Sequence, residues 1–378
     1  MFRAMLPSDP LQPVHIFITA GDPSGDAHAA RLMAAIRTHI PTVVFEGFGG
    51  PEMELQGLRS LAHIRDLAVT GFWEVAKRYR FFRSLLNRCD DAIARTRPVA
   101  FIPVDYPGFN MRLAARARAR TTNRVPVFWY IAPQLWAWGE RRATKLAAAV
   151  DRLFVVFPFE VAFFQRHGIR AEYVGHPLAE EIPVETQGRV PGQVLLMPGS
   201  RAQELHHHTG LLADVVDRVR AHRSDVSFVV ARARNIDLRA LEPLVQRNVD
   251  VVDDAHASMQ TASAGIIKAG TSTLEAAFRG LPFATFYRTS PLSYAISKRL
   301  VTVTSVTMMN LLLKRDIVHE YIQHDATSTR IADEIETLLD DSARRTELVT
   351  AMSDVRQMLS GEGASKRTAA LIVEALRR

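Results

Sequence analysis

The stretch VHIFITAGDPSGD, residues 14–26, decides the fold of the first half of this chain. Its apolar beginning is typical of a buried strand, Gly21 and Gly25 mark a turn, and a helical pattern follows. The stretch VLLMPGSR, residues 194–201, repeats that order at the head of the second half. A strand, a glycine turn and a helix at the start of each half predict two α/β domains with parallel sheets.

Short apolar runs alternate with longer helical patterns on either side of these two stretches. The predicted strands span residues 14–20, 43–48, 99–104, 127–131 and 152–156, a short one at Tyr173, and then residues 194–197, 226–231, 249–252, 265–268 and 283–286. Helical patterns include residues 26–38, 110–120 and 140–150. Residues 182–193 contain two prolines and two glycines without periodicity, which predicts the linker between the halves.

This order of elements favours two Rossmann-like domains that face each other across a cleft. Ligands of open α/β sheets bind outside the carboxyl ends of the strands, so we expect the site in this cleft. The expected domains are residues 1–185 and 186–350, followed by a helical segment, residues 351–378, that returns towards the N-terminal domain. Residues 326–378 are nearly all helical in pattern, and we expect them to pack across both domains.

Composition excludes several classes of protein. With 378 residues, of which 47% are apolar and 23% charged, the chain is neither disordered nor of low complexity. Its single cysteine, Cys89, excludes a disulfide scaffold and a cysteine-based zinc site. No apolar run is long enough to span a bilayer, and the N-terminus does not have the pattern of a signal peptide. The sequence therefore predicts a soluble or peripheral protein of the cytoplasm.

Positive charge is concentrated in one part of the chain. The net charge is +7, but residues 71–150 carry 15 basic and 5 acidic residues, a local charge of +10. Within this part, the segment from Phe72 to Arg88 combines basic residues with an apolar stripe that Trp73 and Phe81 widen. Such a helix suits an anionic membrane interface, although a core-facing stripe on a solvated helix is the other interpretation. No recognition motif for nucleic acid accompanies the charge, so we expect no nucleic-acid partner.

One turn in the second half has the features of an anion site. Gly199, Ser200 and Arg201 follow a strand and begin a helix, so backbone N–H groups and the Arg201 guanidinium would meet a phosphate there. A salt bridge between Arg201 and Glu204 is the structural alternative for this arginine.

A second turn of the same kind follows the strand at residues 265–268. It consists of Gly270, Thr271, Ser272 and Thr273, with three hydroxyls at the start of a helix. Glu275 lies one helical turn further on, where its carboxylate would either accept ribose hydroxyls or complete a capping box. Two phosphate-type turns in one domain favour a nucleotide diphosphate.

The first half offers a candidate general base. Asp105 stands at the carboxyl end of an apolar strand, where it would act as a base or cap the following helix. The turn at residues 21–26 is either a substrate loop or a structural turn in which Ser24 or Asp26 caps the helix. The indoles of residues 133–138 suit contact with sugar or lipid, while burial in the core is their commoner role.

A metal site is not expected. Successive helical residues lie about 100° apart, so His206, His207 and His208 do not share one face of a helix. The chain also lacks a D-x-D sequence, which would offer an acidic site for a nucleotide-bound divalent ion.

Taken in order, these motifs resemble the lipid-A-disaccharide synthase family, inverting glycosyltransferases of the two-domain B-type fold. The resemblance covers nearly the whole chain, and its motifs are GDPSGD (21–26), GGPEM (49–53), DYPGFN (105–110), PQLWAW (133–138), VGHPL (174–178), PGSR (198–201), GTSTLE (270–275) and NLL (310–312). The chain departs from the family pattern at Asp22, where glutamate is usual, and at Met309, where proline is usual. It also has the triple histidine, and it lacks a glycine before Lys314.

The resemblance implies a reaction without a cofactor. UDP-2,3-diacylglucosamine and 2,3-diacylglucosamine 1-phosphate would give a β-1,6-linked disaccharide 1-phosphate and UDP. From the residues themselves, we expect Asp105 to act as the base, and Arg201 and the helix that begins near Thr271 to stabilise the leaving diphosphate. The N-terminal domain would face the acceptor and the cytoplasmic side of the inner membrane, and the C-terminal domain would bind the UDP-sugar. The expected substrate-binding residues are Gly21, Ser24, Gly25, Asp26, Asn110, Gln134, Trp136, Gly199, Ser200, Gly270, Thr271, Ser272, Thr273, Glu275 and Asn310.

Two alternatives come from other classes. One is another UDP-sugar enzyme of the same fold, an epimerase or a glycosyltransferase acting on a peptidoglycan lipid, which need not have the basic aromatic segment. The other is a non-catalytic peripheral membrane protein, which would release no UDP.

Overall fold

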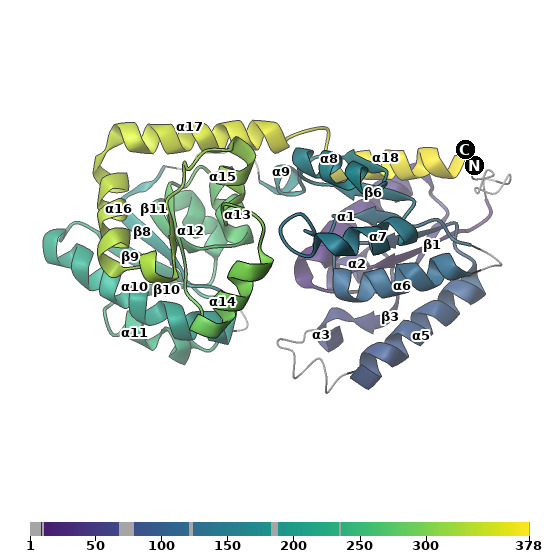
Figure 1. The fold of residues 1–378 in the computed structure, drawn as a ribbon, viewed down its shortest axis with the longest axis horizontal. Coiled ribbons are helices and arrows are strands. Elements are labelled where there is room, and N and C mark those ends of the chain that lie inside the picture. Colours follow the sequence, from purple (N-terminus) through teal and green to yellow (C-terminus); the bar gives the residue numbers. More distant parts are fainter. Residues whose placement is uncertain are drawn as a thin grey trace. The chain divides into compact units, whose positions relative to one another are not determined.

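The chain forms two units, each built on a parallel sheet, in a computed structural model that describes residues 9, 11–67, 79–120, 124–182, 188–233 and 236–377. The first unit contains residues 1–180 and 359–378, and the second contains residues 181–358 (Figure 1). The predicted α/β class with two Rossmann-like domains is confirmed.

The sheet of the first unit has the order β3-β2-β1-β4, and two isolated bridges connect β4 to a second group, β5-β6-β7. All of these pairings are parallel. Its strands are β1 (Val14–Thr19), β2 (Val43–Gly49), β3 (Arg59–His63), β4 (Ala100–Pro103), β5 (Phe128–Tyr130), β6 (Arg152–Val155) and β7 (Ala171–Tyr173). Its helices are α1 (Pro23–His39), α2 (Pro51–Leu55), α3 (Ile64–Leu67), α5 (Tyr79–Thr96), α6 (Pro107–Ala119), η1 (Glu140–Arg142), α7 (Ala143–Ala149), α8 (Pro158–Arg166), α9 (Leu178–Glu181) and α18 (Ala364–Arg377).

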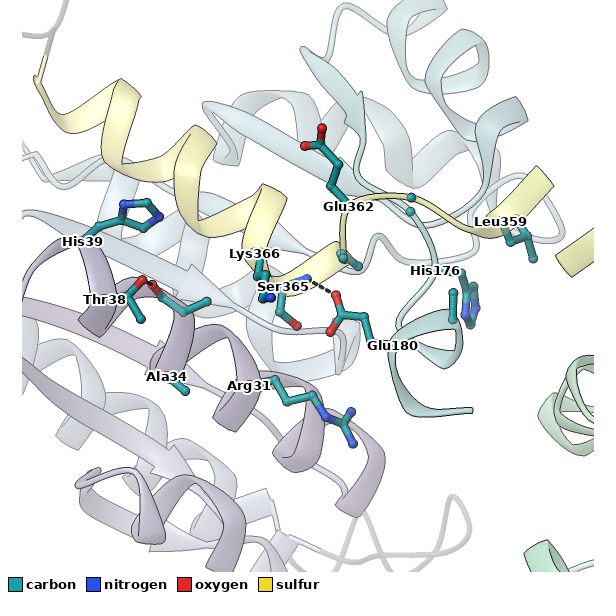
Figure 2. Close-up of a pocket in the computed structure, with 16 residues that line it drawn as sticks. Arg31, Ala34, Thr38, His39, His176, Glu180, Leu359, Glu362, Ser365 and Lys366 are labelled. Carbon is teal, nitrogen blue, oxygen red and sulfur yellow. Dashed lines mark hydrogen bonds between the residues drawn. The ribbon is translucent and has the colours of Figure 1, made fainter. Parts of the chain in front are cut away.

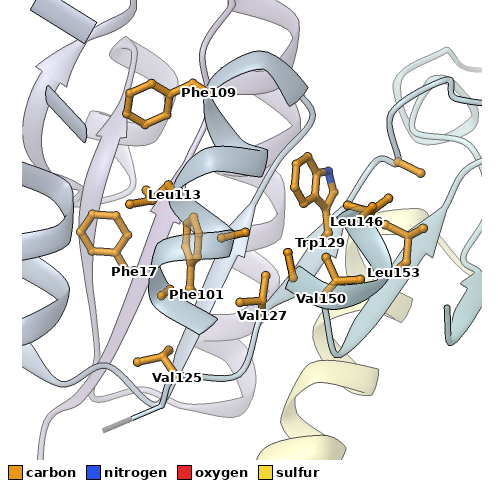
Figure 3. Packing of buried hydrophobic residues seen from close by; sticks show 14 of the residues in the cluster. Phe17, Phe101, Phe109, Leu113, Val125, Val127, Trp129, Leu146, Val150 and Leu153 are labelled. Atoms are coloured by element: carbon orange, nitrogen blue, oxygen red, sulfur yellow. The ribbon is translucent and has the colours of Figure 1, made fainter. Parts of the chain in front are cut away.

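Successive side chains of these strands point to opposite faces of the sheet. Phe17 of β1 joins a cluster with Phe101, Leu113 and Trp129 (Figure 3), whereas its neighbours Ile16 and Ile18 belong to a second cluster. Helices α5, α6 and α7 contribute to the first cluster, and α1 and α18 contribute to the second. The C-terminal helix α18 therefore completes the core of the first unit by packing on α1.

The second unit has one six-stranded parallel sheet of order β10-β9-β8-β11-β12-β13. Its strands are β8 (Val190–Met197), β9 (Ser227–Ala231), β10 (Asp250–Val252), β11 (Ala262–Lys268), β12 (Phe283–Tyr287) and β13 (Glu320–Ile322). Its helices are α10 (Ala202–His222), η2 (Leu238–Leu241), α11 (Glu242–Val245), α12 (Ala255–Thr261), α13 (Thr271–Phe278), α14 (Pro291–Leu300), α15 (Met308–Leu313), η3 (Gln323–Asp325), α16 (Ser328–Asp340) and α17 (Ser342–Leu359).

The linker predicted at residues 182–193 is wrong at its C-terminal end, because β8 already begins at Val190. Gly192 has a positive φ of 69° and lies against the Asp225 backbone, which leaves no space for a side chain. The strand pairing shifts register near this point, between Ala262 and Ala264 of β11. The proline and glycine therefore mark an irregular start of a strand, where the sequence pattern indicated a linker.

Candidate functional site

In both units the predicted motifs follow the two strands at which the sheet order reverses. In the first unit these are β1 and β4, which pair directly, and the turns after them carry Gly21 and Asp105. In the second unit they are β8 and β11, followed by the turns at residues 198–201 and 269–273. Open α/β sheets bind ligands at this point, so the topology places one candidate site in each unit.

Asp105 occupies a strained backbone conformation. Asp105 and Tyr106 both have left-handed φ angles, 43° and 49°, which cost non-glycine residues about 1–3 kcal/mol each. Burial and the negative charge of Asp22 raise the pKa of Asp105 to about 6. The hydrogen bond from the Tyr106 N–H and the electrostatic effect of His28 act in the opposite direction but are smaller than the effect of burial. A carboxylate with a pKa near 6 is a stronger base than an ordinary aspartate and is still ionised at neutral pH.

Asn110 holds this strained turn in place. Its side chain is buried, and its Nδ2 donates to the Asp105 carbonyl at 2.8 Å. Its Oδ1 accepts from the Thr19 hydroxyl at 2.9 Å, which ties the turn to the end of β1. Asn110 thus has partners within the chain for both ends of its amide.

Tyr106 packs on the glycine turn that follows β1. A Cβ at Gly21 would overlap the Tyr106 ring, so only glycine leaves this space for the ring. The two turns of the first candidate site therefore pack together through Gly21.

The helix cap in this turn differs from the expectation. Asp22 caps α1, with its Oδ1 accepting from Gly25 N at 2.7 Å, whereas Ser24 is exposed and lies 3.2 Å from His28 Nε2. Asp26 is buried and instead caps α2, because its carboxylate accepts from the N–H groups of Gly50, Glu52 and Met53. The cap prediction for Ser24 or Asp26 on α1 is therefore wrong: the Asp26 side chain lies beyond the first N–H groups of α1 and reaches the next helix.

Glu160 is a buried carboxylate that the sequence did not indicate. It contacts the loop of residues 133–138, which carries Trp136. Glu160 of α8 accepts from Trp136 Nε1 at 2.8 Å and from the N–H groups of Val156 and Phe157 at 3.1 and 3.0 Å. Burial raises the pKa of Glu160 to about 7, against these three hydrogen bonds, which lower it. Trp136 is half-buried by this contact, while Gln134 is exposed on the same loop.

In the second unit, Glu204 connects the two phosphate-type turns. It is buried, and its carboxylate accepts from Ser200 N at 3.1 Å and from Lys268 Nζ of the neighbouring strand at 3.0 Å. Burial alone would raise the pKa of Glu204, but Lys268, Ser200 and Arg201 together hold it below its ordinary value. Lys268 is the second residue that sequence reasoning missed, because its importance depends on the pairing of β8 with β11.

Arg201 makes the ion pair that was its structural alternative, with Nη1 at 3.1 Å from Glu204 Oε1. Its side chain is nevertheless 66% exposed, so much of the guanidinium remains available to a ligand. Gly199 has a φ of 123°, and a Cβ there would overlap the Glu204 carboxylate. The glycine is thus required for this arrangement of the turn.

The turn before α13 leaves its backbone donors uncapped by side chains. Gly270 is the N-cap residue, with φ 147° and no side-chain cap, and the Thr273 hydroxyl donates to the Gly270 carbonyl at 2.7 Å. Thr271 is exposed and Ser272 half-buried. Glu275 lies 3.7 Å from His256 Nε2 and forms no capping box.

Asn310 is buried inside a hydrogen-bonded loop. Its Nδ2 donates to the Val318 carbonyl and to Glu320 Oε1 at 2.9 and 3.0 Å, and its Oδ1 accepts from the N–H groups of Ile317 and Val318. Glu320 also accepts from the N–H and hydroxyl of Thr307. The Asn310 amide is therefore fully engaged within the chain.

The three histidines have three different environments, as predicted. His206 is exposed, His207 half-buried and His208 buried. His208 Nδ1 lies 2.6 Å from the Pro198 carbonyl, and its Nε2 accepts from Arg288 N at 3.1 Å, which fits the neutral Nδ1–H tautomer. Burial lowers the pKa of His208, whereas the nearby Pro198 and Arg288 carbonyls act to raise it. His208 anchors the Pro198 turn to the end of β12.

The two cavities described below are lined by few of the site residues that the sequence predicted. A pocket of about 740 Å³ in the first unit lies between α1, the start of α18 and residues 175–180 (Figure 2). There Glu180 Oε1 accepts from Ser365 N at 2.6 Å, and none of the predicted site residues lines the pocket. A pocket of about 560 Å³ in the second unit includes Asn310.

The basic aromatic segment from Phe72 to Arg88 is described only from Tyr79 on, and residues 72–78 lie outside the described residues. In α5, Leu86 is buried and Phe82 packs on the core, so this part of the stripe faces inwards. Phe81, expected to widen the apolar surface, also packs against the core, which corrects that expectation. Arg80 and Arg83 are exposed.

Neither a membrane-spanning helix nor a cluster of metal ligands occurs among the described residues. None of the described helices is both long and apolar enough to traverse a bilayer. No group of three or more His, Cys, Asp or Glu side chains in the described ranges is arranged to hold a metal ion.

Comparison with known proteins decides the family. The family model described as lipid-A-disaccharide synthetase matches residues 16–374. The chain belongs to the lipid-A-disaccharide synthetase family. It is 37% identical to the lipid-A-disaccharide synthase of Anaeromyxobacter dehalogenans strain 2CP-1, over 96% of this chain and 97% of that protein. It is 35% identical to the enzyme of the same name from Geobacter sulfurreducens, over 96% and 97%.

Solved structures agree with this family at the level of the fold. The calicheamicin glycosyltransferase CalG4 superposes with a TM-score of 0.60 at 16% identity, over 97% of this chain and 98% of that one. An epimerase-type structure from Listeria monocytogenes gives 0.64 at 11% identity, over 96% of both chains. As a member of the lipid-A-disaccharide synthetase family, the chain is a glycosyltransferase of lipid A biosynthesis that uses a UDP-sugar. The epimerase and non-catalytic alternatives are not favoured.

Proposed function

We propose that the chain transfers 2,3-diacylglucosamine from its UDP derivative to 2,3-diacylglucosamine 1-phosphate. The product is the β-1,6-linked disaccharide 1-phosphate, and the leaving group is UDP. The observation that carries the proposal is Asp105, an aspartate with a pKa of about 6 held in a strained turn at the switch point of the first sheet.

In the proposed reaction Asp105 takes the proton of the acceptor's 6-hydroxyl. The oxygen then attacks the anomeric carbon from the side opposite UDP, and the bond to UDP breaks with inversion. Arg201 and the uncapped N–H groups at the start of α13 would stabilise the charge that develops on the diphosphate. Glu275 would accept the ribose hydroxyls.

The remaining predicted residues divide by exposure. Ser24, Gln134, Ser200, Thr271 and the backbone at Gly270 are exposed and suit direct contact with substrate. Gly199, Trp136 and Ser272 are half-buried and would contribute partial contacts. Gly21, Gly25 and Thr273 are buried, so we propose that they shape their turns. Asp26, Asn110 and Asn310 are buried with their side chains engaged in the chain, so we propose that they position the turns.

The proposed reaction also assigns a role and a membrane location to each unit. The first unit would bind the acceptor and dock on the cytoplasmic face of the inner membrane, with Arg80 and Arg83 of α5 among its lipid contacts. The second unit would bind the UDP-sugar.

The test is turnover of the purified protein with the two diacylated sugars, followed by release of UDP and formation of disaccharide. Asparagine tolerates the left-handed conformation and has the shape of aspartate, so Asp105→Asn should fold normally and lose at least about a hundredfold in turnover. In the parent enzyme kcat/KM should rise with pH through about 6, as Asp105 ionises. Near-parental activity of Asp105→Asn would exclude it as the base.

A further inference from the structure

The second unit carries an amphipathic helix whose apolar side chains are not covered. Helix α14 has no buried residue. Leu292, Ile296 and Leu300 recur every four residues, which places them along one side of the helix, and they are 72%, 51% and 58% exposed. A stripe with this spacing normally faces a core.

The exposed apolar surface continues into the loop after the helix. Val301 and Val306 are also exposed, so five of the fourteen large exposed apolar side chains of the described residues fall within residues 291–306. The stretch LVTVTSVT, residues 300–307, contains no charged residue. A cluster of this kind marks an interaction surface, in contrast to scattered single residues.

Charge indicates which partner the surface fits. Residues 276–315 contain six basic residues and no acidic one, and two of the six, Lys298 and Arg299, are exposed in the last turn of α14. Basic residues at a helix C-terminus also complement the helix dipole, but this does not account for the absence of acidic residues over forty positions. An uncovered apolar stripe with basic residues beside it is the pattern of a helix that lies in an anionic lipid interface.

We propose that α14 and the following loop, residues 291–306, dock on an anionic phospholipid surface. The inference extends the membrane association proposed for the first unit to the second. A second copy of the chain is a poorer fit, because a two-fold contact through this surface would bring Lys298 and Arg299 close to their own counterparts.

The test uses the full chain with one fluorescent label on α14. Ile296→Cys provides an exposed thiol, whereas Cys89 is buried and its pKa is raised to about 12, so it will not react at neutral pH. Val245→Cys on α11, another exposed apolar position of the same unit, is the matched control. Vesicles of phosphatidylglycerol should shift the emission of the Ile296→Cys label to shorter wavelength, and should leave the control label unchanged.

Binding to the same vesicles provides the second measurement. Leu292→Ser with Leu300→Ser should weaken the apparent affinity at least about tenfold, and Lys298→Gln with Arg299→Gln about tenfold to thirtyfold. All four residues are exposed, so the melting temperature should not change. Repeating both measurements in an Arg80→Gln, Arg83→Gln background separates α14 from the first unit, and the label reads binding whether or not the enzyme turns over.

Three results would overturn the proposal. The first is the same label emission with and without phosphatidylglycerol vesicles. The second is an equal shift on vesicles of phosphatidylcholine, which carry no net charge. The third is a shift that appears without vesicles and grows with protein concentration, since it would identify a second copy as the occupant.

Discussion

Gly21 is the residue on which the geometry of the first candidate site depends most directly. Its missing side chain leaves space for the Tyr106 ring, and Tyr106 is one of the two residues with left-handed φ in the Asp105 turn. A methyl group at position 21 would displace the ring and with it the backbone beside Asp105. Gly108 lies in the same region, at the start of α6, with no atom within 4 Å of an added Cβ.

Gly21→Ala should therefore lower turnover at least about tenfold and destabilise the fold by about 1–3 kcal/mol, the usual cost of overpacking. Gly108→Ala should change neither quantity appreciably, because its Cβ meets nothing and alanine favours a helix. The measurements are kcat for the two sugars and chemical denaturation of both variants. Equal losses in the two variants would contradict the role of the Tyr106 contact.

Candidate site residues could be found from the sequence where the signal comes from their neighbours along the chain. An acid directly after an apolar strand indicated Asp105 as a candidate base, and a glycine turn before a helix indicated Gly199 and Gly270 as candidate ligand contacts. The partners of Glu160 and Lys268 come from other segments: Trp136 lies on a distant loop, and Glu204 lies on helix α10. No spacing in the sequence carries that information, so both residues were missed.

At the scale of elements, Glu160 joins α8 to the loop that carries Trp136. It is buried, and burial raises its pKa to about 7, so it keeps its proton to a higher pH than an ordinary glutamate. The folded chain therefore holds this proton above the pH at which an unfolded glutamate, with a pKa near 4.3, loses it. The free energy of unfolding should consequently fall as pH rises from about 4 to about 7.

In Glu160→Gln, the free energy of unfolding should fall less between pH 4 and pH 7, by on the order of 3 kcal/mol. The smaller fall that comes from Asp105, whose pKa is about 6, should remain. The glutamine amide would also present N–H groups to Trp136 Nε1, which needs an acceptor, so the indole should move towards water. Denaturation at several pH values measures the first effect, and a red shift of tryptophan emission measures the second. Trp136→Phe is the control, because Glu160→Gln should add no red shift in that background.

His208 connects three elements of the second unit: α10, the turn after β8 and the end of β12. His208→Ala would leave two buried backbone groups without partners, and we expect a loss of about 2–4 kcal/mol in the free energy of unfolding. His206→Ala, on the exposed side of the same helix, should stay within about 0.5 kcal/mol. Similar losses for the two variants would show that the Pro198 and Arg288 contacts contribute little.

Elements were predictable where their apolar runs are buried, and less so at the edges of the sheets. The strands of the interior, such as β1 and β12, follow the predicted runs closely. The edge strands β3 and β13 have the sequences RSLAH and EYI, which contain no apolar run, because an edge strand with an exposed or half-buried face does not need one. Neither was predicted.

For the whole molecule, the sequence predicted two α/β domains, and the structure shows two units with parallel sheets. The sequence predicted that residues 351–378 return towards the N-terminal domain, but it did not indicate the helix on which α18 packs, because the helical pattern of residues 364–377 shows an apolar face without naming its partner. The structure shows that partner to be α1. Packing partners far apart in sequence are set by the fold as a whole.

The uneven charge of the chain leads to the last prediction. The excess of basic residues in residues 71–150 is a property of the sequence, and Arg80 and Arg83 are exposed where the structure describes them. If this surface binds anionic lipid, affinity for phosphatidylglycerol vesicles should fall steeply with salt, because counterions screen exposed charges. Arg80→Gln with Arg83→Gln should weaken binding about tenfold or more at low salt and flatten the salt dependence.

Position rather than net charge should decide this result, and the chain offers a control for it. Arg218 and Arg239 are exposed on α10 and η2 of the second unit. Arg218→Gln with Arg239→Gln removes the same two charges from the protein, so it lowers the net charge equally but leaves α5 intact. Vesicle flotation at several salt concentrations should separate the two double variants. If both weaken binding equally, the affinity reflects the total charge of the chain, and α5 is then no more than a solvated basic helix.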